Sequence, residues 1–211
     1  MEPAPSRDHP HTVTTTKLLE SLLDPNDHDA WSTLCTRHRP ILEGFVGRLG
    51  LGREDAADIA QETLIRFYEE YRRGRYDRTR GRLRVFLRVI AQRRAIDFLR
   101  KHAPLGGCAG DTALAEQASD DELEHRWDEE EDLVILQQAV DLLQRTSGFQ
   151  PVTIAAFQAV AVQARPAEEV AEELGLTVNS VRVAKSRCLD RVRQLANDLR
   201  RAYAMDEGPL L

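Results

Sequence analysis

The chain has 211 residues, of which 42% are hydrophobic, 30% charged and 6% aromatic, and its formal net charge is −6. This length accommodates one domain or two small ones, and the apolar fraction suffices for packed cores but not for a membrane protein. No apolar run approaches the ~20 residues that cross a bilayer, and the N-terminal stretch lacks the apolar segment of a signal peptide. The three cysteines are scattered and form no Cys-x-x-Cys pair. We therefore expect a cytoplasmic protein without a disulfide framework, a metal site or a cofactor.

Alternating β-branched runs are nearly absent, and apolar residues recur at steps of three and four, which predicts an all-α fold. Charge is segregated along the chain. Residues 27–102 hold 17 Lys/Arg against 11 Asp/Glu, residues 103–143 hold 1 against 12, and residues 144–201 hold 9 against 6. Two basic blocks thus flank an acidic strip. The acidic net charge does not exclude nucleic acid as a ligand, because the local field attracts phosphates.

Composition divides the chain into two small helical domains joined by an acidic linker. The linker is predicted because its sequence is rich in Gly, Ala, Ser and Asp and poor in large apolar residues. The expected organisation is a disordered N-terminus at 1–16, a first domain at 17–102, a linker at 103–130, a second domain at 131–203 and a tail at 204–211.

The first domain begins with an amphipathic segment from Leu18, followed by predicted helices at 29–38 and 40–49. The next helix, at 53–73, carries one regular apolar face. Beside or opposite that face lie Asp58, Gln61 and Glu62, which form a short acidic-polar surface. This surface is either an ordinary solvated helix face or a docking surface for a basic partner.

A segment rich in arginine and aromatic residues comes next. Between Arg66 and Lys101 lie 13 basic and 4 acidic residues, together with six of the chain's twelve aromatic residues. Guanidinium groups bind phosphates, and each base stacked on an aromatic ring contributes roughly 1–3 kcal/mol. We expect a loop at 74–82 and a helix from Leu83. The alternative is a solubilising basic surface over an aromatic core, but the local excess of arginine favours binding of single-stranded nucleic acid.

The second domain contains a helix-turn-helix pattern. Pro166 begins a short helix, Gly175 permits the turn, and Thr177 is the expected N-cap of the next helix. A tight helical hairpin without a DNA-binding role is the alternative reading. The turn glycine and the basic outer face favour DNA binding. The side chains that suit base edges and phosphates in a major groove are Asn179, Ser180, Arg182, Lys185, Ser186 and Arg187.

Together these features resemble a bacterial RNA polymerase sigma factor of the sigma-70 family, of the small, two-domain extracytoplasmic-function (ECF) type. The resemblance covers residues 17–201 and includes the opening DPNDHDAW at 24–31. The family's second region is similar to DAADIAQETLIRFYEEY followed by YDRTRGRLRVFLRVIAQRRAIDFLRK. Its fourth region is similar to RPAEEVAEELGLTVNSVRVAKSRCLDRVR.

The resemblance implies a non-enzymatic subunit that directs transcription initiation. Asp58, Gln61 and Glu62 would dock on the clamp of the largest subunit of core polymerase, and the helix-turn-helix would read the −35 element of promoter DNA. The linker would thread the RNA-exit side of the polymerase. The implied contacts to the −10 element are Tyr76, Arg82, Arg84, Arg88, Arg93 and Arg94.

Two positions depart from the family pattern. Many members carry Trp where Phe86 stands, and many carry Asn where Arg93 stands, which leaves the base preference at that −10 step open. The sequence has no His and Cys cluster of the kind used by zinc-binding anti-sigma proteins. Any anti-sigma regulator is therefore expected to be a separate protein.

Two other functions compete with this reading. An ordinary helix-turn-helix regulator would bind duplex operator DNA without polymerase, but it has little use for the arginine and aromatic mixture. A metal-dependent nuclease could use the carboxylates at 120–132. No histidines stand at ligand spacing there, and no P-loop or nucleophile elbow is found, so we expect no enzyme.

Overall fold

The computed structural model describes residues 15–24, 27–77, 81–102, 118–146 and 148–204. Every element within these ranges is a helix, as the hydrophobic periodicity predicts. No helix among them is long and apolar enough to cross a membrane. Residues 1–14, the first part of the predicted linker (103–117) and the tail from residue 205 lie outside the described ranges. The chain divides into two units, one formed by residues 1–134 with 201–211 and the other by residues 135–200.

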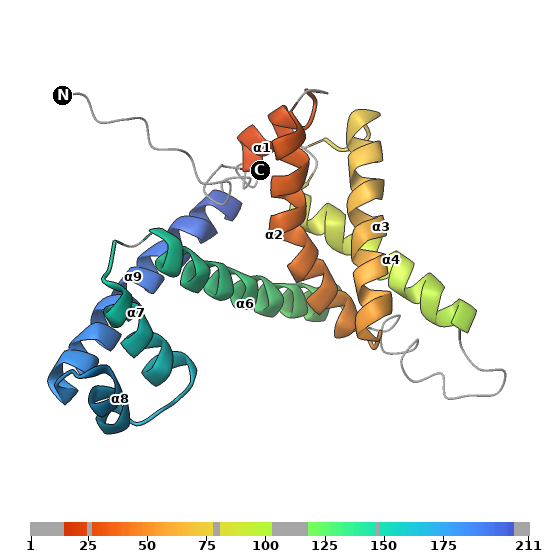
Figure 1. The fold of residues 1–211 in the computed structure, drawn as a ribbon. Coiled ribbons are helices and arrows are strands. Elements are labelled where there is room, and N and C mark those ends of the chain that lie inside the picture. The colour runs from red at the N-terminus through yellow and green to blue at the C-terminus, as the bar shows by residue number, and fades with distance from the viewer. Residues whose placement is uncertain (1–14, 25–26, 78–80, 103–117, 147, 205–211) are drawn as a thin grey trace, which may run out of the picture. The chain divides into compact units, whose positions relative to one another are not determined.

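The first unit is built on four helices, of which α2 packs on α3 and α3 on α4 (Figure 1). These helices are α1 (Thr15–Ser21), α2 (His28–Gly47), α3 (Arg53–Arg72) and α4 (Leu83–His102). Each contributes large apolar side chains to one core, including Leu19, Leu34, Phe45, Leu64, Phe67 and Leu87.

Helix α2 is one continuous helix where the sequence predicted two. It begins after Asp27, whose carboxylate accepts a hydrogen bond of 3.1 Å from the N–H of Ala30. Pro40 lies inside the helix on its exposed side. A proline removes one helical hydrogen bond, which is the basis of the predicted break. The helix continues because Leu34 before the proline and Ile41 after it are both buried in the same core.

The structure also differs from the predicted linker, because α6 (Asp120–Thr146) begins inside it. A capping box starts this helix: the N–H of Glu122 donates to the Ser119 hydroxyl, and the N–H of Ser119 donates to the Glu122 carboxylate. Leu123 and Trp127, one helical turn apart, are each 1% exposed. The Trp127 ring packs against Phe45 of α2 with centroids 5.6 Å apart. The first half of α6 is therefore part of the first unit rather than a solvated linker.

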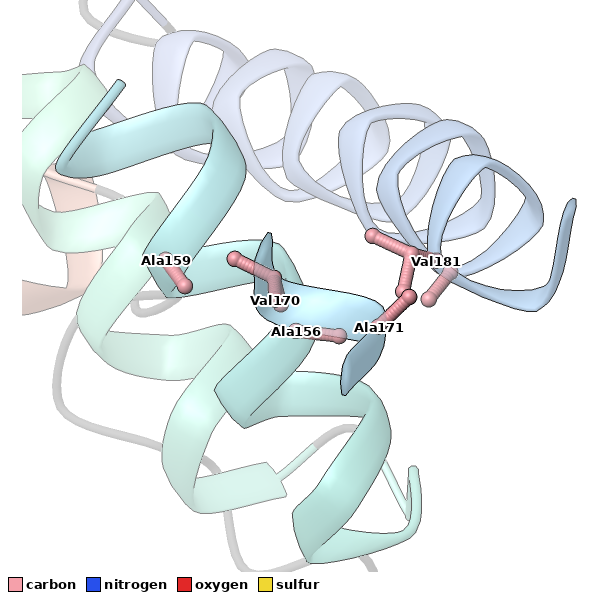
Figure 2. Close-up of a cluster of buried hydrophobic side chains, with 6 residues drawn as sticks. Ala156, Ala159, Val170, Ala171 and Val181 are labelled. Atoms are coloured by element: carbon pink, nitrogen blue, oxygen red, sulfur yellow. The ribbon is translucent and has the colours of Figure 1, made fainter. Parts of the chain in front are cut away.

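The second unit starts with the remainder of α6 and continues through three short elements and one long helix. These are α7 (Pro151–Phe157), the π-helical turn η1 (Gln158–Val162), α8 (Ala167–Leu174) and α9 (Val178–Ala204). Small apolar side chains from α7, η1, α8 and α9 converge in its centre (Figure 2). The cluster consists of Ala156, Ala159, Val170, Ala171, Val181 and Ala184.

Candidate functional site

The polar surface predicted on α3 exists as one exposed strip. Asp58, Gln61 and Glu62 are all exposed, while Ile59 and Thr63 between and beside them are buried. Residues at i, i+3 and i+4 share a helix face, so the three side chains can be presented to one partner. Two carboxylates and an amide with no apolar side chain between them suit a basic surface.

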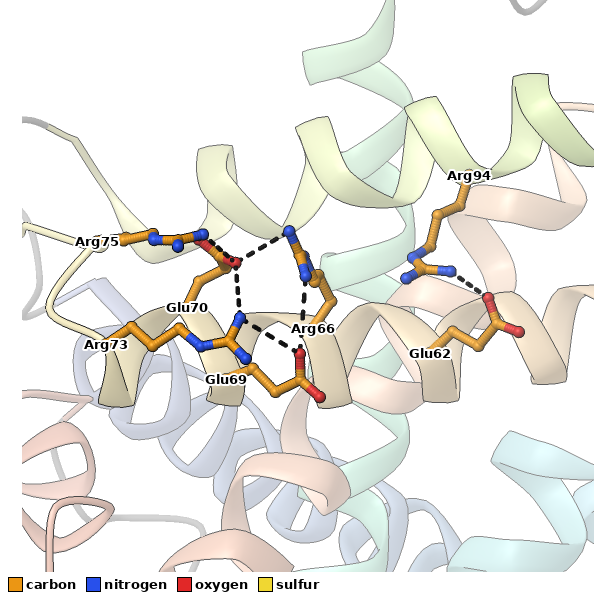
Figure 3. A network of polar contacts seen from close by, with 7 residues as sticks. All are labelled: Glu62, Arg66, Glu69, Glu70, Arg73, Arg75 and Arg94. Carbon is orange, nitrogen blue, oxygen red and sulfur yellow. Dashed lines mark hydrogen bonds and ion pairs between the residues drawn. The ribbon is translucent and has the colours of Figure 1, made fainter.

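Glu62 also reaches α4, because its carboxylate forms an ion pair with Arg94 (Figure 3). Both side chains remain accessible, at 36% for Arg94 and 54% for Glu62. Exposed pairs of this kind contribute only about 0–1 kcal/mol. A partner can therefore displace it at small cost. The pair joins one residue of the predicted docking set to one residue of the predicted −10 set.

A second charged cluster on α3 was not predicted from the sequence. Glu70 is 8% exposed and forms ion pairs with three arginines, with nearest N···O distances of 3.0 Å to Arg66, 3.7 Å to Arg73 and 3.1 Å to Arg75 (Figure 3). The N–H of Arg75 also donates to the carbonyl of Glu70 at 2.9 Å. These contacts fix the chain where α3 ends. The sequence did carry a signal for this cluster: Glu70 stands three residues after Phe67, which places its carboxylate on the buried face of α3.

Tyr76 lies in the core rather than on the surface. It is 7% exposed, and its ring packs edge-on against Phe67 and Phe86, with centroids 5.6 and 5.2 Å away. Its hydroxyl donates to the carbonyl of Gly81 at 3.2 Å. In this arrangement the ring is tied to Gly81, just before α4, and offers no face on which a base could stack.

The arginines predicted for −10 DNA are not equally accessible. Arg93 is exposed, Arg82, Arg84 and Arg94 are half-buried, and Arg88 is only 7% exposed. All but Arg82 lie on α4. The structure thus places five of the six predicted −10 residues on α4 or just before it, but Arg88 is as buried as Tyr76, so four of the six are accessible.

The first half of α6 covers part of this arginine set. Arg84 forms ion pairs with Asp128, with Glu124 at 3.4 Å and with Glu131 at 3.6 Å. Arg88 donates to the backbone carbonyl of Asp120 at 3.0 Å. The acidic face of α6 therefore meets α4 at two of the predicted DNA-binding positions.

The same helix is held to α2 by charge. Arg48 pairs with Glu129 at 2.6 Å and with Glu130, and Arg126 donates to the carbonyl of Arg48 at 3.3 Å. Glu131 is more enclosed and accepts from the Trp127 indole N–H at 3.0 Å. Burial raises the pKa of Glu131, and Arg84 and the indole hydrogen bond oppose that rise.

In the second unit, α8 and α9 are joined by the turn that the sequence predicts. Gly175 adopts φ 64°, in the left-handed region that favours glycine. The Thr177 hydroxyl accepts a hydrogen bond of 3.0 Å from the N–H of Ser180, which caps α9 as expected. Val170 and Ala171 of α8 are buried against Val181 of α9 (Figure 2).

The six predicted −35 residues all lie in the first three turns of α9. Five are exposed and Lys185 is half-buried; the exposed ones are Asn179, Ser180, Arg182, Ser186 and Arg187. The buried residues of the same turns are Val181, Ala184 and Cys188. Arg182 reaches Glu168 of α8 at 3.4 Å, and both side chains stay about two-thirds exposed.

One family model matches the chain. Residues 34–104, or 71 of the 211 residues, match sigma-70 region 2. The match spans most of α2 and all of α3 and α4, and so includes the Asp58 strip and the α4 arginines. No curated protein matches the chain significantly. Residues 34–104, about a third of the chain, are therefore similar to sigma-70 region 2.

Proposed function

We propose that the chain is a sigma factor of the ECF type. It binds core RNA polymerase through α3 and recognises the −10 and −35 elements of promoters through α4 and α9. The observation that carries this proposal is the exposed strip of Asp58, Gln61 and Glu62 inside the segment that matches region 2. A second helical unit follows that segment, and region 2 plus one further unit is the organisation expected of this type.

The docking partner in this proposal is the clamp of the largest polymerase subunit. Complementary charge fixes orientation and speeds association, and the carboxylates of Asp58 and Glu62 supply that charge. Gln61 adds an amide that can donate or accept. Because the strip lies on a helix packed on both α2 and α4, the three side chains are held in a rigid relative position.

Recognition of −10 DNA is assigned to the exposed part of the arginine set. Arg93 is open to solvent, and Arg94 is released when Glu62 takes up a polymerase contact. Tyr76 is given a supporting role, because it packs under Phe86 beside the start of α4.

Recognition of −35 DNA is assigned to α9. Its N-terminal turns carry amide, hydroxyl and cationic side chains on one exposed face, the groups that read base edges and phosphates in a major groove. The short helix α8, packed against α9 across the Gly175 turn, suits the role of the first helix of a helix-turn-helix. A protein with this role would act in the cytoplasm, where the polymerase works.

The test is retention of the full-length chain on immobilised core RNA polymerase. Wild type is expected to be retained and Asp58→Arg to lose at least about tenfold in affinity, as expected when about 1.4 kcal/mol of a charge contact is reversed. Asp58→Arg leaves the Glu62–Arg94 ion pair in place, so its effect is confined to the strip. The double variant Asp58→Arg/Glu62→Arg should abolish retention.

A matched control reverses two exposed carboxylates elsewhere in the first unit, Glu20→Arg/Asp97→Arg. It should be retained like wild type. Equal losses in the control and the Asp58 variants would reject the docking strip. Failure of wild type to bind core, combined with tight binding of duplex DNA by the chain alone, would instead favour an ordinary helix-turn-helix regulator.

A further inference from the structure

We propose that the first half of α6, residues 120–134, is an intramolecular competitor for the DNA strand on the arginine surface of α4. This inference rests on the proposed function, because it concerns regulation of the proposed −10 surface. In the free chain the carboxylates of residues 120–134 occupy that surface, and a DNA strand must displace them in order to bind.

Three carboxylates of α6 surround the guanidinium of Arg84: Asp128, Glu124 at 3.4 Å and Glu131 at 3.6 Å. Guanidinium groups bind phosphate oxygens with the same donor geometry that they use for carboxylates. The side chain of Arg84 is only 25% exposed. A phosphate that approaches this guanidinium meets these partners, so the acids and the strand compete for the same donors.

Arg88, one turn further along α4, is also covered by α6. It donates to the carbonyl of Asp120 at 3.0 Å and is 7% exposed. The first turn of α6 therefore covers the next arginine of the same face. Arg93, in contrast, is exposed. The acidic helix thus shields one end of the α4 arginine set and leaves another position open.

The way in which α6 is held explains why this cover is present in the free chain. Leu123 and Trp127 are each 1% exposed and anchor the helix in the apolar core of the first unit. Arg48 holds Glu129 and Glu130 on the far side of the same helix. The burial of Leu123 and Trp127, rather than the attraction between the carboxylates and Arg84, therefore holds these carboxylates beside Arg84.

The individual ion pairs are weak enough to be exchanged. Glu124 and Asp128 are 48% and 51% exposed, and exposed pairs contribute only about 0–1 kcal/mol each. A strand presented on polymerase can replace them without unfolding α6. A strand met by the free chain has to overcome the same carboxylates without help from the polymerase, so its affinity is low.

A purely structural role for these pairs makes the opposite prediction. If Arg84 served only to position α6, removal of the acids would lower stability and would leave strand binding unchanged. The competitor role predicts that strand binding increases. The two roles are therefore separated by the sign of the change in DNA affinity.

The experiment measures binding of the full-length chain to a fluorescein-labelled single-stranded oligodeoxythymidine of about 12 nucleotides, at low ionic strength. Glu124→Gln/Asp128→Asn is expected to bind about tenfold more tightly than wild type. The control Glu20→Gln/Asp29→Asn makes the same change in net charge at exposed positions of α1 and α2, away from both α4 and α6. It should stay within about twofold of wild type. The gain should shrink as salt is raised.

Adding Arg84→Gln to the α6 variant should remove the gain, because the released donor is then absent. Thermal unfolding of each variant establishes that the fold is retained. A folded α6 variant that binds the strand no more tightly than the control overturns the competitor role, as does a gain that survives Arg84→Gln. The proposed function is decided separately by retention of wild type on core polymerase, so the two failures are distinguishable.

Discussion

At the scale of single residues, His38 gives the clearest physical signature in the first unit. It is 7% exposed, and neither ring nitrogen has a hydrogen-bond partner among the described residues. Arg37 precedes it, and the ring of Tyr203 lies 6.0 Å away. Burial, and then the positive charge of Arg37, lower the pKa of His38 to about 3. The imidazole is therefore neutral in the folded chain at all ordinary pH values.

This pKa predicts an acid-sensitive fold. Between pH 6.5 and about 3 the unfolded chain binds a proton at this position and the folded chain does not, so stability falls as pH falls. From pH ~7.5 to ~5 the expected loss is about 2 kcal/mol. His38→Leu should remove that part of the pH dependence. Urea unfolding at both pH values measures it, and equal losses in wild type and variant would contradict the burial of a neutral His38.

The sequence predicted the exposure of a single side chain only where that side chain has a known position on a regular helix. Asp58, Gln61 and Glu62 are exposed because they stand off the apolar face of a regular helix, a relation visible in the sequence. Tyr76 precedes α4 outside any regular element, so no periodicity shows which way its ring points. Its burial follows from Phe67 and Phe86, which lie on two different helices, α3 and α4.

At the scale of elements, composition gave a wrong prediction for the start of α6, where a high content of carboxylates coincides with a narrow apolar stripe. The segment from Asp120 holds so many carboxylates that it reads as solvated linker, yet Leu123 and Trp127 form a narrow apolar stripe behind a capping box. The α8–α9 turn was predictable, because Gly175 and Thr177 have conformations set by local chemistry.

The anchoring role of Trp127 gives a prediction for α6. Trp127→Ala should destabilise the first unit by about 3–5 kcal/mol, since truncation of a fully buried aromatic ring leaves a cavity against Phe45. Leu133→Ala on the same helix is the matched control: Leu133 is 55% exposed, so its truncation should cost little. Denaturant unfolding measures both, and hydrogen exchange should show loss of protection over 120–134 only in the Trp127 variant. Similar costs for both variants would contradict the anchor.

At the scale of the whole molecule, the distribution of charge matters more than its sum. A net charge of −6 by itself predicts that added salt stabilises the fold, because salt screens self-repulsion. The first unit instead pairs its charges across helices, with Arg48 and Arg84 facing the acids of α6. Screening weakens such pairs. The two views therefore predict opposite signs for the effect of salt on stability.

We expect the paired arrangement to dominate. Raising potassium chloride from about 0.05 to 0.5 M should lower the stability of the first unit by up to about 1 kcal/mol, the scale of exposed ion pairs. Glu124→Gln/Asp128→Asn should be less sensitive, because two of the pairs to Arg84 are already neutralised. Thermal unfolding at the two salt concentrations measures the difference. Stabilisation by salt in wild type would mean that net repulsion outweighs the cross-helix pairs, and the acidic half of α6 would then be held by Leu123 and Trp127 alone.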